Sequence, residues 1–134
     1  MTPLHVQALT ALSRPLAHKF YRAQHSPMRA HRHDRVWVAL QSEIVAALCL
    51  RPVPPGHWLT GLLVAPAYRR QGVACRLLEQ VLAETEGPVW LFCDPELDAF
   101  YQRLGFTQCL ELPPALAERL ARYRRSKPLI ALYR

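Results

Sequence analysis

The sequence lacks the features that would place it among membrane or secreted proteins. None of its apolar runs approaches the roughly 20 residues that a membrane-spanning helix needs. Residues 1–12 do not show the basic start, apolar block and small-residue cleavage site of a secretory signal peptide. We therefore predict a cytoplasmic protein with no membrane partner.

Cysteine pairs are missing as well. None of the four cysteines belongs to a CxxC pair, and each lies in an apolar or helical context. This pattern predicts buried free thiols in a reducing compartment; disulfides or a zinc site are the alternatives. His31, His33 and Asp34 could also hold a metal, but histidines in a polar loop are usually solvated, so no metal is predicted. The cysteines are Cys49, Cys75, Cys93 and Cys109.

Acidic residues are few, with 10 Asp and Glu against 17 Lys and Arg, which gives a formal net charge of +7. Such an excess suits an acidic ligand, nucleic acid included. Neither of the two basic clusters has the interleaved aromatic side chains of a base-stacking surface. We interpret both as mainly solvated faces, so nucleic acid is not the predicted partner, although the charge does not exclude it. One cluster comprises Lys19, Arg22, Arg29, Arg32 and Arg35, and the other Arg119, Arg122, Arg124, Arg125, Lys127 and Arg134.

What the chain has is a succession of short strands and helices, punctuated by prolines and glycines. Its 134 residues, 51% of them hydrophobic, suffice for one core and so for a single domain, 1–134. The order of the elements predicts an α/β (α+β) fold, in which a mixed sheet of about six to seven strands has helices on both faces. The expected strands are 4–9, 36–40, 44–50, 58–64, 89–93, 106–112 and 129–133. The expected helices are 13–24, 73–85, 95–104 and one that Pro113 and Pro114 open.

Individual residues are expected to end or orient these elements. Ser13 can cap the first helix and Asp94 the third, because a short polar side chain at this position accepts a backbone N–H. Gly105 can close the third helix in a left-handed conformation. A run of prolines from Pro52 should stop the strand before it. The residues expected to face inward are Leu16, Phe20 and Ala23 in the first helix, Leu77, Leu78, Val81 and Leu82 in the second, and Leu116, Leu120 and Tyr123 in the last.

The most informative stretch runs from the strand 58–64 into the helix 73–85. At a helix start several backbone N–H groups lack partners, and the macrodipole adds partial positive charge. Gly72 leaves room for an anion to approach the backbone, and Arg69 and Arg70 can add charge-assisted hydrogen bonds. The stretch therefore predicts a pyrophosphate site. Surface arginines without a ligand are the alternative, but positive charge at a helix start opposes the dipole.

This loop is neither a Walker loop nor a GxGxxG loop. It resembles the Q/R-x-x-G-x-G/A signature of the GCN5-related N-acetyltransferase (GNAT) family, which residues 69–74 fill as Arg-Arg-Gln-Gly-Val-Ala. The preceding Leu62–Pro66 is similar to a strand end of that family. Ala99–Phe106, about 30 residues further on, is similar to its FYxxxGF motif. Together the motifs extend the resemblance over about residues 36 to 112.

The resemblance implies a GNAT-like fold, with a mostly antiparallel sheet whose central strands splay apart, and acetyl-CoA as cosubstrate. It implies that the pantetheine arm pairs with exposed backbone in the splay between 62–64 and 89–93, and that the loop holds the pyrophosphate. Tyr101 would lie near the thioester sulfur and protonate the leaving thiolate; a core tyrosine is the alternative. The implied cofactor-binding residues are Leu62, Leu63, Val64, Arg69, Arg70, Gln71, Gly72, Val73, Ala74 and Cys75.

The implied activity is direct transfer of an acetyl group to the primary amine of an unidentified acceptor, a small molecule or a peptide. Backbone N–H groups near Leu62 or Leu63 can stabilise the developing oxyanion. The base that deprotonates the amine is left open between His57, Glu43 and a chain of water molecules. A coenzyme A-binding regulator without turnover and a basic nucleic-acid-associated module are the alternatives from other classes. The protein could be a monomer or a homodimer.

Two places depart from the pattern of the family. Seven residues before the tyrosine the family often has asparagine, whereas this chain has Asp94, which can serve as a helix cap. The segment 113–126 is longer than the tight hairpin that usually joins the last two strands. Its apolar residues recur at helical spacing, so it is expected to be a helix inserted between those strands.

Overall fold

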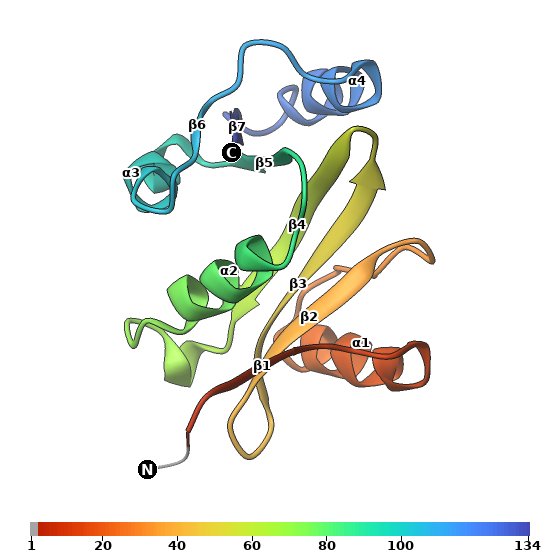
Figure 1. Cartoon of the computed structure of the whole chain (residues 1–134), viewed down its shortest axis with the longest axis vertical. Helices are drawn as coiled ribbons and strands as arrows, with labels where there is room; N and C mark the ends of the chain where they lie inside the picture. The colour runs from red at the N-terminus through yellow and green to blue at the C-terminus, as the bar shows by residue number, and fades with distance from the viewer. Residues whose placement is uncertain (1–2) are drawn as a thin grey trace. The chain divides into compact units, whose positions relative to one another are not determined.

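The structure of the protein, a computed structural model, describes residues 3–134 (Figure 1). In this range it has a seven-stranded sheet of order β1-β2-β3-β4-β5-β7-β6 and four α-helices. β4 and β5 are parallel, and the pairs β1–β2, β2–β3, β5–β7 and β6–β7 are antiparallel. The predicted mixed, mostly antiparallel sheet is confirmed. The strands are β1 (His5–Ala8), β2 (Arg35–Leu40), β3 (Ile44–Val53), β4 (Gly56–Val64), β5 (Val89–Cys93), β6 (Thr107–Gln108) and β7 (Ile130–Tyr133). The helices are α1 (Arg14–Ala23), α2 (Val73–Ala83), α3 (Asp98–Gln102) and α4 (Pro114–Tyr123).

The described chain forms two compact units. The first comprises the chain up to Pro52 together with Leu59–Glu86, and the second comprises Val53–Trp58 together with Gly87–Arg134. Strands β3 and β4 therefore contribute residues to both units. That residues 1–134 form a single domain stays a prediction, because cooperative unfolding is what would establish it.

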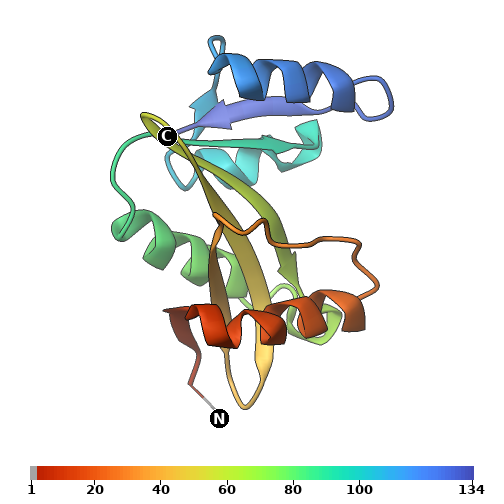
Figure 2. The ribbon, with the colours of Figure 1, turned by 90° about the vertical axis from the view of Figure 1, so that its right-hand side faces the viewer.

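In the first unit, α1 and α2 cover opposite faces of the strands (Figures 1 and 2). The predicted inner face of α2 is confirmed, since Leu77, Leu78, Val81 and Leu82 are buried. On the other face, a core cluster joins α1 to β2 and β3. Its buried members are Ala17, Phe20, Tyr21, Val36, Val38, Ala47, Cys49 and Ala65.

The prediction for the inner face of α1 is wrong in part. Leu16 is 54% exposed and Ala23 is also exposed, whereas Ala17, Phe20 and Tyr21 are buried. These three follow the i, i+3, i+4 spacing of an apolar stripe, so the stripe is shifted by one residue from the predicted one. Tyr21 belongs to the core although its side chain ends in a hydroxyl, so hydropathy alone does not predict its burial.

Ser13 stands at the predicted N-cap position of α1 but makes no cap hydrogen bond. A 3-10 turn at Ala11–Ser13 precedes the helix and already holds Ser13 in a helical conformation, with φ −93° and ψ −4°. A capping side chain normally needs an extended backbone at this position. The Ser13 hydroxyl instead accepts a hydrogen bond from the hydroxyl of Thr10 at 3.2 Å.

The prolines after β3 act later than predicted. β3 continues through Pro52 to Val53, and the turn to β4 is formed by Pro54 and Pro55. The φ of proline is compatible with extended structure, and only its missing N–H limits it within a sheet. A proline at the end of a long strand is therefore tolerated where a stop was expected.

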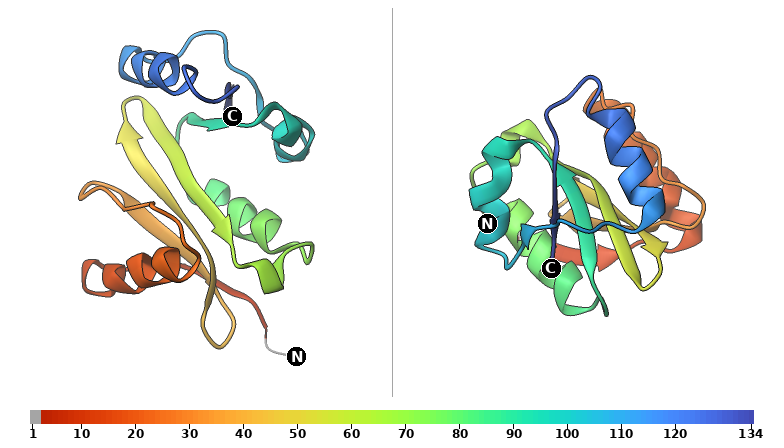
Figure 3. Two further views of the ribbon diagram at one scale, coloured as in Figure 1. Left: turned by 180° about the vertical axis from the view of Figure 1, so that it is seen from behind. Right: turned by 90° about the horizontal axis from the view of Figure 1, so that it is seen from above.

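In the second unit, α3 and α4 lie on opposite sides of β5 and β7 (Figure 3). Trp58, Trp90 and Leu116 form its buried cluster, and the Arg119 guanidinium lies 4.9 Å from the centre of the Trp58 ring. The predicted helix between the last two strands is confirmed as α4. It buries Leu116 and Leu120, while Tyr123 remains 37% exposed.

Two elements of the second unit are shorter than predicted. The helix expected at 95–104 is a 3-10 turn, Pro95–Leu97, followed by α3. The strand expected at 106–112 pairs only over Thr107–Gln108, although the Cys109 N–H still donates to Ala131 at 2.9 Å. Pro113 and Pro114 lead into α4 and have no N–H to donate to a neighbouring strand. The chain therefore leaves the sheet before residue 112.

Candidate functional site

The end of β4 passes into α2 through a loop with an unusual backbone. A 3-10 turn, Pro66–Tyr68, follows the strand, and α2 begins at Val73. Gly72, the N-cap residue, has φ 77°, and Arg70 has φ 62°. Both angles are left-handed, and glycine, which stands at position 72, adopts such an angle most readily. The loop therefore has a defined shape that the sequence supports locally.

The start of α2 has a row of unused hydrogen-bond donors. Within residues 3–134, no acceptor contacts the backbone N–H groups of Gly72, Val73, Ala74 or Cys75, and the first internal bond runs from Arg76 N to Gly72 O at 3.0 Å. The helix has no side-chain cap and no acidic residue in its first turn. In the same described range, no atom lies within 4 Å of where a Cβ on Gly72 would be. The arrangement suits an anion, which would satisfy these donors.

Side chains of the predicted loop residues brace its backbone. The Arg69 Nε donates to the Val64 carbonyl at 3.0 Å, and the Gln71 amide donates to the Ala67 carbonyl at 3.1 Å. Arg70 is exposed and has no polar partner within the described part of the chain. Arg70 is thus the loop arginine whose charge is fully available to a ligand, while Arg69 shares its donors with the strand.

Cys75, in the first turn of α2, has a thiol with a partner inside the helix. Its Sγ donates to the Glu79 carboxylate at 3.2 Å. This hydrogen bond, with smaller contributions from burial and from the Glu79 charge, raises the pKa of the Cys75 thiol. A helix N-terminus ordinarily lowers a thiol pKa, so the pairing with Glu79 keeps Cys75 protonated.

The middle of β4 carries a feature that the motifs did not identify. Gly61 has φ 69°, and the Tyr21 hydroxyl of α1 donates to its carbonyl at 2.7 Å. Leu62, Leu63 and Val64, which follow, are half-buried. A glycine within an apolar strand indicates a bulge or a close approach, and this signal was present in the sequence at Gly61. Tyr21 had no comparable signal.

Glu43, a candidate base, precedes the first residue of β3. It is exposed in the turn between β2 and β3, and the nearby Val45 carbonyl accepts the Ala65 N–H at 2.8 Å. Gly61 is four residues back along β4 from Ala65, which is roughly 13 Å at the rise of a strand. Glu43 therefore lies near the end of β4, and its role as a candidate base stays a prediction.

The second unit contains Tyr101, the predicted general acid. Its ring packs edge-on against those of Phe100 and Phe106, with ring centroids 5.1 Å and 5.6 Å away. Burial, with a smaller contribution from Cys93, raises the pKa of Tyr101 to about 12. The phenol therefore holds its proton at neutral pH and is available as a donor.

His57, the other candidate base, lies in the part of β4 that pairs with β5. It stands opposite Val89, and its backbone N–H donates to Pro88 at 2.9 Å. Its side-chain Nδ1 is buried and has no hydrogen-bond partner among the described residues. A buried ring nitrogen without a partner is costly unless a ligand or water satisfies it.

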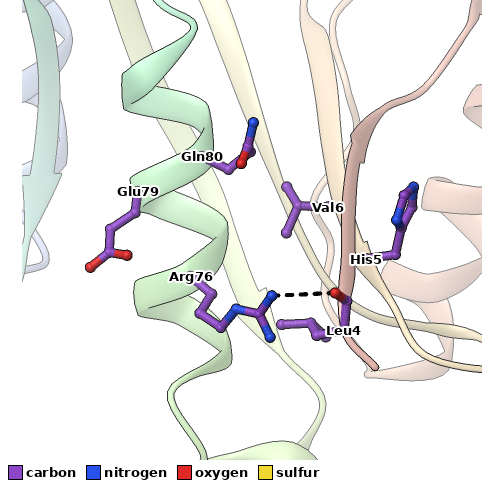
Figure 4. A pocket seen from close by; sticks show the side chains of 6 residues that line it. All are labelled: Leu4, His5, Val6, Arg76, Glu79 and Gln80. Carbon is purple, nitrogen blue, oxygen red and sulfur yellow. Dashed lines mark hydrogen bonds between the residues drawn. The ribbon is translucent and has the colours of Figure 1, made fainter. Parts of the chain in front are cut away.

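A separate open cavity of about 440 Å³ lies between β1 and α2 (Figure 4). An Arg76 guanidinium N–H approaches the Leu4 carbonyl at 3.4 Å along its floor. None of the predicted site residues lines it. Its lining residues are Leu4, His5, Val6, Arg76, Glu79 and Gln80.

Several predictions about other kinds of site can be set beside the structure. The described cysteines are free, and Cys49 and Cys93 are buried as predicted. The prediction of burial is wrong for Cys75 and Cys109, which are half-buried. Residues 3–134 contain no group of three or more side chains that could hold a metal ion. Asp34 is buried and paired with Arg51 at 3.0 Å. Among the helices of the described range, none has the length and apolar character to cross a membrane.

Comparison with protein families identifies the class to which this fold and loop belong. A family model described as "Acetyltransferase (GNAT) domain" matches residues 32–108, which is more than half of the chain. The chain therefore belongs to the GNAT family, and acyl transfer is the general reaction of its class. A comparison with curated protein sequences gives no match.

Solved structures share the fold at low sequence identity. The crystal structure of Escherichia coli ElaA is 18% identical with a TM-score of 0.70, over 100% of this chain and 99% of that one. The ribosomal-protein-S18-alanine N-acetyltransferase from Escherichia coli is also 18% identical, with a TM-score of 0.70 over 98% and 91%. N-acetylglutamate synthase from Neisseria gonorrhoeae, complexed with coenzyme A and N-acetyl-glutamate, is 13% identical, with a TM-score of 0.69 over 100% of this chain and 35% of that one. These likenesses confirm the GNAT fold.

Proposed function

We propose that the protein is an N-acetyltransferase that moves an acetyl group directly from acetyl-CoA to a primary amine. The observation that carries the proposal is the start of α2, where the N–H groups of Gly72, Val73, Ala74 and Cys75 have no acceptor in residues 3–134. An anion with several oxygens satisfies such a row, and a pyrophosphate does so best. Family membership supports coenzyme A as its source.

The remaining cofactor contacts follow from the same family resemblance. Leu62, Leu63 and Val64 supply backbone groups to the pantetheine arm, and Arg70 supplies charge to the phosphates. Arg69 and Gln71 act mainly by holding the loop, because their side chains bond to its own carbonyls. These two roles can be tested separately. Arg70 should contribute to acetyl-CoA binding through its charge, and Gln71 through the shape of the loop.

Catalysis in this proposal depends on position and on hydrogen-bond donors. The amine attacks the thioester carbon, a backbone N–H near Leu62 stabilises the oxyanion, and the C–S bond breaks as the amide forms. Tyr101 donates to the leaving sulfur. Its pKa of about 12 exceeds that of an ordinary thiol, about 8.5, so its hydrogen bond matters more than early proton transfer. His57, Glu43 or a water chain removes the proton from the amine.

The acceptor is a small molecule or peptide with a free amine, and the experiment must therefore use a panel. Purified protein is mixed with acetyl-CoA and with small amines, polyamines, amino acids and peptides, and free thiol release is measured. Acetyl-CoA should also raise the melting temperature, because it binds only the folded state. Protein that is stabilised by acetyl-CoA but consumes no thioester with any amine would be a coenzyme A-binding regulator instead. The proposal would be refuted if acetyl-CoA neither raised the melting temperature nor was consumed with any amine.

A further inference from the structure

A buried chain of hydrogen bonds links α1 to the middle of β4. Tyr21 is 0% exposed, and its hydroxyl donates its one proton to the Gly61 carbonyl at 2.7 Å. The Cys49 sulfur lies 3.9 Å from the same hydroxyl, and since the phenol proton is already used, the thiol is the donor there. Burial raises the pKa values of both groups, that of Cys49 to about 11. The chain thus stays fully protonated at neutral pH and points in one direction, toward Gly61.

Gly61 is held on two sides. Its left-handed φ of 69° turns its carbonyl to Tyr21, and a Cβ at this position would come within 2.9 Å of the Met28 side chain. Met28 belongs to the connection after α1, which the buried carboxylate of Asp34 ties down by accepting the His31 N–H at 2.8 Å. Glycine adopts this backbone angle without strain and leaves the space that Met28 occupies.

The direction of one carbonyl determines the direction of the next amide. The cis peptide bond of the described chain is at Pro54–Pro55, so the Gly61–Leu62 peptide is trans. In a trans peptide the C=O and the following N–H point to opposite sides. Because the Gly61 carbonyl is drawn to Tyr21, the Leu62 N–H is directed away from α1.

We infer that Tyr21 is a positioning residue for acetyl transfer: through its bond to the Gly61 carbonyl it aims the Leu62 N–H at the thioester oxygen. The inference rests on the proposed function, in which this amide stabilises the oxyanion. A donor stabilises a transition state only if it is already oriented when charge develops. A hydrogen bond to the carbonyl of a peptide also polarises its N–H, which strengthens the donor.

The test measures the thioester itself and needs no acceptor. Acetyl-CoA labelled with ¹³C at the acetyl carbonyl is bound to the protein, and the carbonyl stretching frequency is measured by infrared difference spectroscopy. The wild type should lower this frequency relative to free acetyl-CoA. Tyr21→Phe, which removes only the hydroxyl, should lose most of that shift. With the best amine of the panel, kcat should fall by about tenfold or more while KM for acetyl-CoA stays nearly constant.

Matched variants separate positioning from stability. Phe20→Leu disturbs the neighbouring core residue, whose ring lies 5.8 Å from that of Tyr21, but leaves the hydroxyl in place. It should lower the melting temperature and keep the infrared shift. If Tyr21→Phe does not fold, 3-fluorotyrosine incorporated at position 21 serves instead. Its more acidic phenol is a stronger donor, so the carbonyl frequency should fall further than in the wild type.

The outcomes distinguish this inference from the function beneath it. A wild-type shift that Tyr21→Phe or the fluorinated residue leaves unchanged would overturn the inference, and the proposed function would stand. A wild type that binds no acetyl-CoA would refute the proposed function and this inference with it. A shift lost equally in Phe20→Leu would show that general loosening of α1, rather than the hydroxyl, is responsible.

Discussion

Two strands of the sheet, β4 and β5, each run into a helical turn, and the two turns are built in opposite ways. After β4, the N-cap is Gly72 without a side chain, and the first turn of α2 contains no acidic residue. After β5, the N-cap is Asp94, whose carboxylate accepts the Glu96 N–H at 2.9 Å, and Glu96 and Asp98 add negative charge. The second turn satisfies its own donors, whereas the first leaves them for a ligand.

The difference shows how the residues at a helix start determine whether it can bind an anion. A helix start with a cap and acidic residues is stabilised from within and would repel an anion. The start of α2, with glycine and arginine, lacks that internal stabilisation. It is stabilised to a similar degree only when an anion binds. The acidic turn is followed within α3 by Tyr101, so in the second unit the turn positions a side chain rather than a phosphate.

The largest effect is expected from a substitution that fills the space at Gly72, where the N–H groups of α2 are unused. Gly72→Glu should abolish the stabilisation by acetyl-CoA, which for the wild type is about 2.7 kcal/mol at a ligand concentration 100 times Kd. The new carboxylate would take the place of the phosphate and repel it. Thermal unfolding with and without acetyl-CoA measures the effect.

Gly72→Ala is the control for that experiment. It imposes the same cost of a side chain at φ 77° and adds no charge, and it meets no atom within 4 Å in the described chain. It should retain a reduced shift. An undiminished shift in Gly72→Glu would mean that acetyl-CoA binds elsewhere.

The next effect in size concerns the second turn and the tyrosine that follows it. Tyr101→Phe should leave the affinity for acetyl-CoA unchanged and lower turnover by roughly tenfold to a thousandfold. Since the pKa of Tyr101 is about 12, its proton is lost only as the pH rises through that value. The activity of the wild type should therefore show no alkaline limb from Tyr101 below about pH 11. Turnover that does not change in Tyr101→Phe would make this residue structural.

Much of the fold was predictable from the sequence because its strands and helices have strong local patterns. The apolar runs at β2, β3 and β5, the periodic α2 and the proline-led α4 all appear where the sequence predicts them. Errors arose where tertiary contacts decide. β6 is cut to Thr107–Gln108 by the demands of α4, and α1 turns Tyr21 inward because a partner, Gly61, lies across the sheet.

The candidate site divides in the same way. The loop from Arg69 to Cys75 could be predicted because its chemistry is local: a glycine, two arginines and a helix start within seven residues. Tyr21 could not, since its role depends on Gly61, 40 positions away in the chain. Glu43 is a candidate base from the sequence alone, and the pairing of Val45 with Ala65 places its turn near the end of β4.

A smaller effect is expected from removing the cap of the second turn. Asp94→Ala should lower the free energy of unfolding by about 1 kcal/mol, because the Glu96 N–H loses its acceptor. Asp94→Asn keeps an acceptor and should lose much less. Neither variant should change the stabilisation by acetyl-CoA, if the two turns have the separate roles described above. A loss of acetyl-CoA binding in both would show that Asp94 contributes to the cofactor site.

The smallest expected effect sharpens the comparison at Cys75, which lies within the first turn of α2. The hydrogen bond to Glu79 and the Glu79 charge raise the pKa of this thiol, so Glu79→Gln should lower it. The thiolate fraction at pH 8 then rises, and alkylation of Cys75 by iodoacetamide should become a few times faster. Cys109, half-buried in the second unit, serves as the reference thiol in the same sample. Acetyl-CoA should slow the labelling of Cys75 in both proteins, because the phosphate would bind beside it, and should leave Cys109 unaffected. Equal labelling of Cys75 with and without saturating acetyl-CoA would place the cofactor away from the start of α2.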